Sequence, residues 1–114
     1  MQKIKVFEEA KNNKDSNVNY KVYWAYENAK EAGNELLDFN DVIWEQDIPE
    51  IIEACRENNI TTFTISSTFS SLITTLAEFE RLGCQMSGLV KVKSCNTDYQ
   101  TGEHQIIPAI KMEL

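Results

Sequence analysis

A row of carboxylates follows a tryptophan in the first half of the chain. Glu27, Glu31 and Glu35 are spaced i, i+4 and i+8, and Trp24 comes just before them. On a helix, side chains at this spacing form one ridge with neighbours about 5–6 Å apart. Carboxylates in such a row can imitate phosphates, and tryptophan is a favoured anchor of protein interfaces. The predicted partner-binding residues are Trp24, Glu27, Glu31, Glu35, Asp38 and Asp41.

The negative charge of the chain is concentrated in the same region. Residues 27–57 hold ten acidic and two basic side chains and carry −8, whereas the rest of the chain carries +1 and the whole carries −7. This distribution argues against direct nucleic-acid binding and predicts a protein partner with a basic surface. The competing interpretation is a solvated acidic face whose aromatic side chains are covered by the N-terminal segment.

Catalytic and metal sites find little support in the residue pattern. His104 is the only histidine, and a Cys95–His104 pair across a hairpin is the one arrangement that could form a nucleophile with its base. The cysteines match no zinc spacing, and the acidic loop around Asp38 lacks the glycine of a calcium loop. The hydroxyl-rich run at 66–71 lacks the glycines and lysine of a phosphate-binding loop. We therefore expect no enzyme activity, no cofactor and no metal.

Length and composition predict one domain over residues 1–114. The 114 residues include 42% apolar and 25% charged side chains, which is ordinary for a globular protein. The chain has no apolar run of membrane-spanning length and no signal-peptide pattern at its start. Three cysteines without a CxxC pair fit a reducing compartment, so a cytoplasmic location without membrane contact is expected.

Two helices are marked clearly in the first half. Apolar residues recur at helical spacing over 18–33, and Gly33 stands where a helix would end. A second helix follows Asp47, a predicted N-cap, with Pro49 in its first turn. Leu36 to Trp44 indicates a loop with a short extended piece. Residues 3–12 are compatible with either a helix or a strand, and the polar stretch 11–17 is typical of a loop or a frayed helix end.

The second half predicts a strand, a helix and two more strands. The β-branched run 60–65 indicates a strand, and a helix ending at Gly83 follows, with Phe69, Leu72, Ile73, Leu76 and Phe79 as its buried face. Residues 89–94 and 105–114 are expected to pair antiparallel, with Pro108 at an edge or a bulge. The predicted fold class is α+β, with a three- to four-stranded mixed sheet (β-α-β-β in the C-terminal half) packed on helices and a helical N-terminal half.

The sequence also resembles a family of short, uncharacterised proteins carried by conjugative and phage-like elements of Gram-positive bacteria. The resemblance rests on Tyr23–Leu36, Phe63–Ser71 and Thr101–Ala109 and covers nearly the whole chain. It brings no assigned catalytic residues. It implies that the chain is accessory cargo of mobile DNA, a setting in which small acidic proteins include anti-CRISPR and other counter-defence proteins.

These observations lead to three hypotheses. The first is a non-enzymatic inhibitor of a nucleic-acid-handling host enzyme, specifically an anti-CRISPR protein that occupies a basic surface of a type II RNA-guided nuclease. The second is a regulatory or accessory protein of the mobile element that binds another protein or a small molecule, with an acidic face that only solubilises. The third and weakest is a small hydrolase that uses Cys95 and His104. An exposed C-terminal strand edge could also support a homodimer.

Overall fold

The computed structural model describes residues 3–10, 18–67 and 70–114 and has an α+β fold, as predicted. The helices are α1 (Lys5–Ala10), α2 (Tyr20–Ala32), α3 (Ile48–Glu57) and α4 (Leu72–Arg81), with a 3-10 turn, η1 (Glu45–Asp47), before α3. The strands are β1 (Asp38–Phe39), β2 (Thr62–Ile65), β3 (Gln85–Thr97) and β4 (His104–Glu113).

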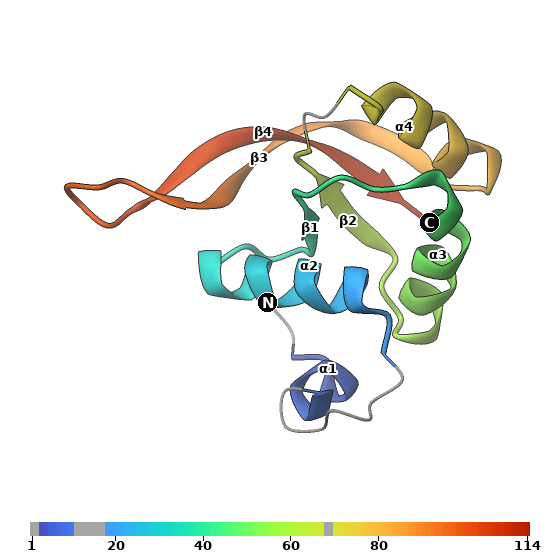
Figure 1. Cartoon of the computed structure of the whole chain (residues 1–114), viewed down its shortest axis with the longest axis horizontal. Coiled ribbons are helices and arrows are strands. Elements are labelled where there is room, and N and C mark those ends of the chain that lie inside the picture. The colour runs from blue at the N-terminus through green and yellow to red at the C-terminus, as the bar shows by residue number, and fades with distance from the viewer. Residues whose placement is uncertain (1–2, 11–17, 68–69) are drawn as a thin grey trace.

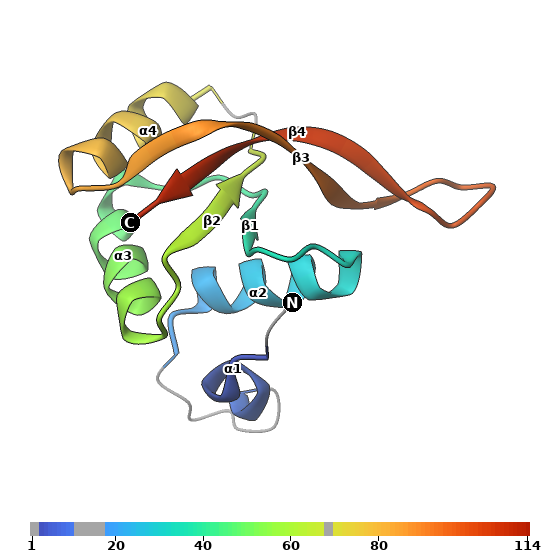
Figure 2. The ribbon, with the colours of Figure 1, turned by 180° about the vertical axis from the view of Figure 1, so that it is seen from behind.

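The described strands form one four-stranded mixed sheet in the order β1-β2-β4-β3. β1 is parallel to β2, and β4 is antiparallel to both β2 and β3. β2 and β3 therefore run parallel to each other, as two strands joined by a crossover helix do, with β4 inserted between them. In both views of the ribbon, α4 lies above the β3–β4 hairpin and α2 below it (Figures 1 and 2).

The β3–β4 hairpin extends far beyond the helices as a twisted arm (Figure 1). Its turn is held by Asp98, whose side chain accepts hydrogen bonds from the amides of Gln100 (2.7 Å) and Thr101 (3.1 Å). Gly102 has a φ of 72°, a left-handed conformation that glycine adopts at no steric cost. The predicted turn at Thr101 and Gly102 is thus confirmed.

Pro108 does not place β4 at the edge of the sheet. β4 is an interior strand, but its pairing with β2 ends at the Ile65–Ile110 pair, so around Pro108 it pairs only with β3. Pro108 faces Lys91 at that point, and the bulges lie in β3 instead, between Met86 and Gly88 and after Lys93. Proline is tolerated here because its missing N–H falls where no neighbouring strand needs a donor.

The helix ends agree with most of the local signals. Asn19 caps α2 by accepting hydrogen bonds from the Lys21 and Val22 amides at 2.9 and 3.2 Å, and Gly33 ends it with a φ of 85°. Asp47 precedes α3 as predicted, although its side chain makes no capping bond. α4 begins after Ser71, which likewise makes no side-chain cap.

The predicted buried face of α4 needs one correction. Leu76 and Phe79 are buried and Leu72 is partly buried, but Ile73 is 76% exposed. Thr75 takes the core position instead and donates a hydrogen bond to the carbonyl oxygen of Ile43 at 3.1 Å. The face therefore follows Leu72, Leu76 and Phe79, from which Ile73 is rotated by about 100°. Phe69 lies outside the described residues.

The N-terminal segment is helical. α1 resolves the ambiguity over residues 3–12 in favour of a helix from Lys5 to Ala10, while residues 11–17 lie outside the described part of the chain. Phe7 is buried and packs on the rings of Tyr26 and Tyr23, with centroids 5.3 and 6.3 Å apart. α1 thus covers part of the aromatic surface of α2, as the solvated-face interpretation expected.

Candidate functional site

Helix α2 is built to lie close to the sheet on one side and to expose aromatic rings on the other. Ala25, Ala29 and Ala32 are buried, and their small side chains let the helix approach β1 and β3. Tyr20 and Trp24, one turn apart, are 56% and 57% exposed. The two rings therefore stand at the edge of the helix, free to meet another molecule.

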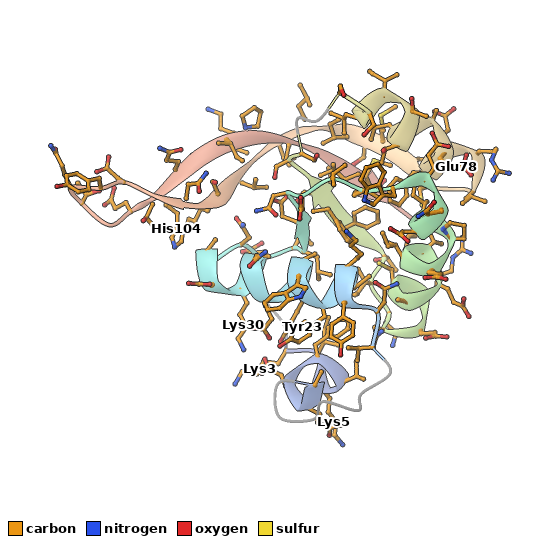
Figure 3. The ribbon with its side chains drawn as sticks, viewed as in Figure 1. Lys3, Lys5, Tyr23, Lys30, Glu78 and His104 are labelled. Carbon is orange, nitrogen blue, oxygen red and sulfur yellow. The ribbon has the colours of Figure 1, made fainter. Side chains whose placement is uncertain are left out.

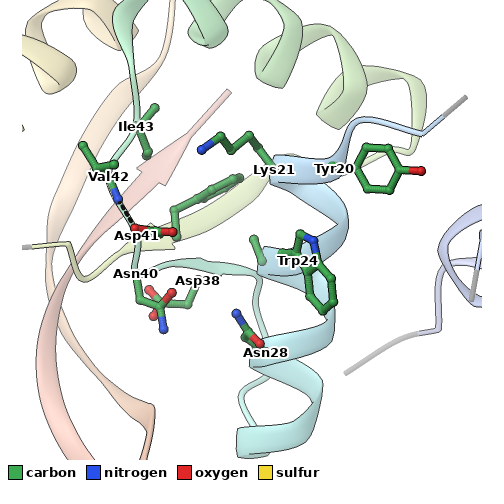
Figure 4. A pocket seen from close by; sticks show the side chains of 11 residues that line it. Tyr20, Lys21, Trp24, Asn28, Asp38, Asn40, Asp41, Val42 and Ile43 are labelled. Atoms are coloured by element: carbon green, nitrogen blue, oxygen red, sulfur yellow. Dashed lines mark hydrogen bonds between the residues drawn. The ribbon is translucent and has the colours of Figure 1, made fainter.

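The exposed rings border a pocket between α2 and the segment 38–43, which we call the Trp24 pocket (Figure 4). Its volume is about 550 Å³. α2 contributes a polar and aromatic wall, and the opposite wall runs from β1 into the following loop. The residues used below are Tyr20, Lys21, Trp24, Asn28, Asp38 and Asp41. Three of the six predicted partner-binding residues, Trp24, Asp38 and Asp41, are brought together here.

Asp38 lies at the buried end of the pocket. It is 4% exposed, and its carboxylate accepts hydrogen bonds from Thr64 Oγ1 at 2.7 Å and Ser66 Oγ at 2.6 Å. Burial raises the pKa of the Asp38 carboxyl, while the two hydroxyl hydrogen bonds partly offset that rise. Asp38 is therefore buried and lines the pocket, which corrects the prediction that it belongs to an open acidic face.

Asp41 and Lys21 line the more open part of the pocket. Asp41 is exposed and accepts a hydrogen bond from the Val42 amide at 2.8 Å, which fixes the start of the loop (Figure 4). Lys21 is partly buried and reaches across the pocket toward that loop (Figure 4). Apart from the Tyr20 phenol, the ionisable groups lining the pocket are two carboxyls and one ammonium, of which only the ammonium would oppose a bound cation.

An aromatic chain links the pocket to α1. Tyr23 makes edge contacts with Trp24 and Tyr20, with ring centroids 5.2 and 6.3 Å apart, and it also contacts Phe7 of α1. Tyr23 and Lys30 point to the side of α2 that faces α1 (Figure 3). The Tyr26 hydroxyl donates to Glu8 Oε1 at 2.6 Å, and Lys30 pairs with the same carboxylate. The docking of α1 thus supports the rings at the pocket rim.

The glutamates do not form the predicted ridge. Glu27 is partly buried and Glu31 is exposed on α2, but Glu35 lies beyond the end of the helix. Gly33 ends the helix in a left-handed conformation, so the i+8 position is not helical. Glu35 instead lines a second groove beside Lys93 of β3. The prediction of a continuous row of carboxylates on one rigid helix is therefore wrong.

The remaining acidic residues of the charged segment lie on another element. Glu50, Glu53 and Glu57 are exposed on α3, and the apolar stripe of Ile48, Ile51, Ile52 and Cys55 is buried as predicted. The local charge of −8 is thus divided among α2 with its following loop, Glu45 and Asp47 of η1, and the outer face of α3.

The cysteines and the histidine are the candidates for nucleophilic chemistry. Burial raises the pKa of the Cys55 thiol to about 12, which leaves it an unreactive thiol. His104 Nδ1 lies 2.8 Å from the carbonyl oxygen of Ser94, while the Cys95 side chain lies outside what the structure describes. The Cys95–His104 pair thus stays a prediction. In the described ranges, no three metal-binding side chains converge.

Sequence reasoning missed three polar members of the pocket wall, Lys21, Asn28 and Asn40. The sequence did contain an indication of this wall. Tyr20, Trp24 and Asn28 have the same i, i+4, i+8 spacing as the glutamates, which predicts that they share one face of the helix. Trp44, the other exposed tryptophan at 55%, does not line the pocket.

Comparison with known proteins gives one match. A family model described as a domain of unknown function (DUF7698) matches residues 21–114. No curated protein and no solved structure matches the chain. Within the described residues, no helix combines the length and hydropathy needed to cross a membrane.

Proposed function

Because the chain belongs to the DUF7698 family, whose defining domain has no known function, we propose its role from the pocket itself: a non-enzymatic binding protein that captures a cationic group of its partner. The single observation that carries this proposal is the meeting of Trp24 with Asp38 and Asp41 in one concave site. The proposal keeps the predicted basic partner but moves the binding site from the glutamate row to the pocket.

The chemistry of the pocket favours a cation. An exposed tryptophan face attracts a cation, and the attraction increases as the pair is desolvated. Asp41 offers an exposed carboxylate nearby, and Asp38 offers a buried one whose ionised form a bound cation would stabilise. A guanidinium group fits best, because it can stack on an aromatic ring and donate several hydrogen bonds in one plane.

The first test uses the two tryptophans as matched reporters. Trp44→Phe leaves Trp24 as the only tryptophan, and Trp24→Phe leaves Trp44, which is equally exposed but outside the pocket, so emission excited selectively at tryptophan reports one site at a time. Each variant is titrated with N-acetyl-arginine amide, with a peptide containing a single arginine, and with the same peptide containing citrulline. Arginine ligands should change only the Trp24 emission, and citrulline should change neither.

The same titration separates the possible sources of the cation. Binding of the free amide as tightly as the peptide favours a small organic cation, whereas a clear preference for the peptide favours a protein partner. Trp24→Ala lacks the fluorescent reporter, so its binding is followed by NMR amide shifts, and it should weaken peptide binding about thirtyfold if the ring is an interface anchor. Equal binding of the citrulline peptide, or amide shifts centred on Glu50 and Glu53 of α3, would contradict the proposal.

We further propose an identity for the partner, a nucleic-acid-handling enzyme and specifically a type II RNA-guided nuclease. It rests on the resemblance to proteins of mobile elements, and the acidic charge of the chain supports it. In this mechanism a basic side chain of the nuclease channel enters the Trp24 pocket and the acidic surface excludes DNA. Charge attraction predicts that inhibition weakens as ionic strength rises.

A DNA-cleavage assay at two salt concentrations tests this partner. Inhibition that is lost in Trp24→Ala but only weakened when Glu27, Glu31 and Glu35 are all changed to Gln supports the pocket mechanism. Loss of inhibition in the triple Gln variant but not in Trp24→Ala would assign the binding role to the glutamates instead of the pocket. If the wild-type chain does not inhibit the nuclease, this partner is wrong.

A second candidate function is an accessory protein that binds a small molecule. The volume of the pocket, about 550 Å³, lies within the range of small-molecule sites, and Glu31 stands exposed to solvent. The comparison of the free amide with the peptide decides between this candidate and protein capture.

A further inference from the structure

A second surface lies along β3, which is an edge strand of the sheet. β3 has 13 residues, and its pairing with β4 is regular from Gly88 to Lys93. An edge strand presents main-chain N–H and C=O groups that can pair with another chain. The question is which of these groups face outward and what lies beside them.

Asn34 shows the orientation of the edge. Its side-chain Nδ2 donates to the Lys93 carbonyl oxygen, and its Oδ1 accepts from the Lys93 amide, both at 2.8 Å. These are the two hydrogen bonds that a neighbouring strand would make with Lys93. The main-chain groups of Lys93 therefore point away from β4.

The groups of Lys91 and Leu89 point the same way. Outward and inward residues alternate along a strand, and the register with β4 is unbroken between Leu89 and Lys93. The proline opposite Lys91, Pro108, agrees with this orientation because a pair facing away from each other exchanges no hydrogen bond. Within the described part of the chain, no strand or side chain occupies the outer groups of Leu89 and Lys91.

One face of this edge carries two lysines after an exposed leucine, Leu89, and the other face carries valines. Lys91 and Lys93 are exposed on one face of β3, whereas Val90 and Val92 lie on the opposite face, where Val92 is buried. Beside them is a groove of about 450 Å³ that reaches Leu36, Glu35 and the partly buried Lys111. Three lysines and one glutamate make the surroundings of this edge positively charged, in contrast to the chain as a whole.

We propose that the β3 edge binds an extended acidic segment of a protein partner, which adds to the sheet as a further strand beside Leu89 and Lys91. Alternate side chains of the added strand would meet Lys91 and Lys93 on one face and Val90 with the adjoining groove on the other. Acidic and apolar residues in alternation satisfy both faces. This inference concerns a surface separate from the Trp24 pocket and does not depend on it.

A second copy of this chain is a poorer occupant. β3 contains no acidic residue, so antiparallel pairing of two β3 edges about Lys91 would set one lysine directly against the other. Like charges in directly opposite positions destabilise a strand pair. The charge pattern therefore acts against self-association and leaves the edge open to a partner of opposite charge.

The experiment is an NMR titration of the full chain with a short blocked peptide in which Glu and Val alternate. We expect the largest amide shifts at Leu89 and Lys91, together with slower hydrogen exchange of those two amides. A peptide in which Lys replaces Glu tests charge, and a peptide with proline in place of alternate residues tests main-chain pairing. Neither control peptide should bind detectably.

Two variants at Lys91 separate the contribution of charge from that of main-chain pairing, now by changing the protein rather than the peptide. Lys91→Gln removes the charge and should weaken binding about twofold. Lys91→Pro also removes the outward N–H while leaving the bonds to β4 intact, and should weaken binding about tenfold. Trp24→Ala should leave binding unchanged, so that failure here and failure of the pocket proposal are distinguishable.

Several outcomes would overturn the proposal. Binding of the proline-containing peptide as tightly as the alternating peptide would mean charge attraction without strand addition. Binding of the Lys peptide, or shifts centred on the Trp24 pocket, would place the ligand elsewhere. A concentration-dependent dimer whose interface maps to β3 without peptide would make a second copy the occupant. Absence of any amide shift with the Glu and Val peptide would mean that the β3 edge does not bind such a segment.

Discussion

Around the Trp24 pocket the recognition groups are side chains, whereas along the β3 edge they are main-chain atoms. The pocket combines rings of α2 with the carboxyls of Asp38 and Asp41, which come from a different element. The β3 edge combines a fixed pattern of N–H and C=O groups with Lys91 and Lys93. The pocket can therefore be altered by changing one side chain, but the edge is changed fully only by substitutions that remove a main-chain group.

The two regions also differ in charge. The pocket has two carboxyls and one lysine, and the β3 groove has three lysines and one glutamate. A chain of net charge −7 thus carries a basic surface as well as acidic ones. Net charge alone predicts a basic partner, but the arrangement of the charges permits one basic ligand and one acidic ligand at separate places.

The largest effect is expected from the buried carboxyl of the pocket. Asp38→Ala should lower the free energy of unfolding by about 3 kcal/mol, because the buried Ser66 hydroxyl loses its acceptor and Thr64 keeps only its longer bond, to the Leu37 carbonyl oxygen at 3.2 Å. Asp41→Ala should cost about 0.5 kcal/mol or less, because Asp41 is exposed. Urea unfolding followed by tryptophan fluorescence measures both. Equal losses would mean that the two carboxyls do not have separate structural and binding roles.

Loss of the Asn34 contact at the β3 edge should lower the free energy of unfolding less than Asp38→Ala does. Asn34→Ala removes two exposed hydrogen bonds to Lys93 and should lower the free energy of unfolding by about 1 kcal/mol. Asn34→Asp keeps the acceptor but loses the donor, so its loss should be smaller. Hydrogen exchange at the Lys93 amide should be faster in Asn34→Ala than in Asn34→Asp. Identical exchange in both variants would contradict the role of Oδ1 as the acceptor of that amide.

Most of the fold could be predicted because its signals are local. The ends of α2, the proline in the first turn of α3 and the β-branched run of β2 each act within a few residues. Glu35 shows how two local patterns can conflict. The ridge required the helix to continue, but Gly33 stops it, and a left-handed glycine outweighs a charge spacing worth a few tenths of a kcal/mol.

The assembly of the pocket could not be predicted in the same way. It depends on the parallel pairing of β1 with β2, which holds Asp38 beside Thr64 and sets the following loop against α2. That pairing joins a two-residue strand to residues 26 positions away, and no local pattern specifies it. The order of the sheet, with β4 between β2 and β3, is non-local for the same reason.

The buried carboxyl also predicts a pH dependence with a definite sign. Because the folded-state pKa of Asp38 is raised by burial, its protonated form stabilises the fold. That contribution is present below the ordinary aspartate pKa of about 3.9 and is lost as the pH rises through the raised folded value. Asp38→Asn resembles the protonated form at every pH, because its amide can donate to Thr64 Oγ1.

The measurement compares the wild type with Asp38→Asn by urea unfolding from about pH 3 to 7. The stability of the wild type relative to the variant should fall as the pH rises through the window above 3.9, and should then stay constant. Comparing the two proteins removes the pH-dependent contributions that they share, such as that of Asp98, whose lowered pKa acts in the opposite direction. A rise in relative stability with pH would mean that the hydrogen bonds outweigh burial at Asp38.

The smallest effect is expected from the lysine inside the pocket. Lys21 competes with a bound cation, so Lys21→Gln should tighten binding of N-acetyl-arginine amide about twofold. Lys5→Gln makes the same change in net charge on α1, away from the pocket, and should leave the affinity nearly unchanged. Titration by Trp24 fluorescence in the Trp44→Phe background measures both. Equal tightening by the two variants would assign the effect to net charge, and weaker binding in Lys21→Gln would mean that the lysine contacts an anionic ligand instead.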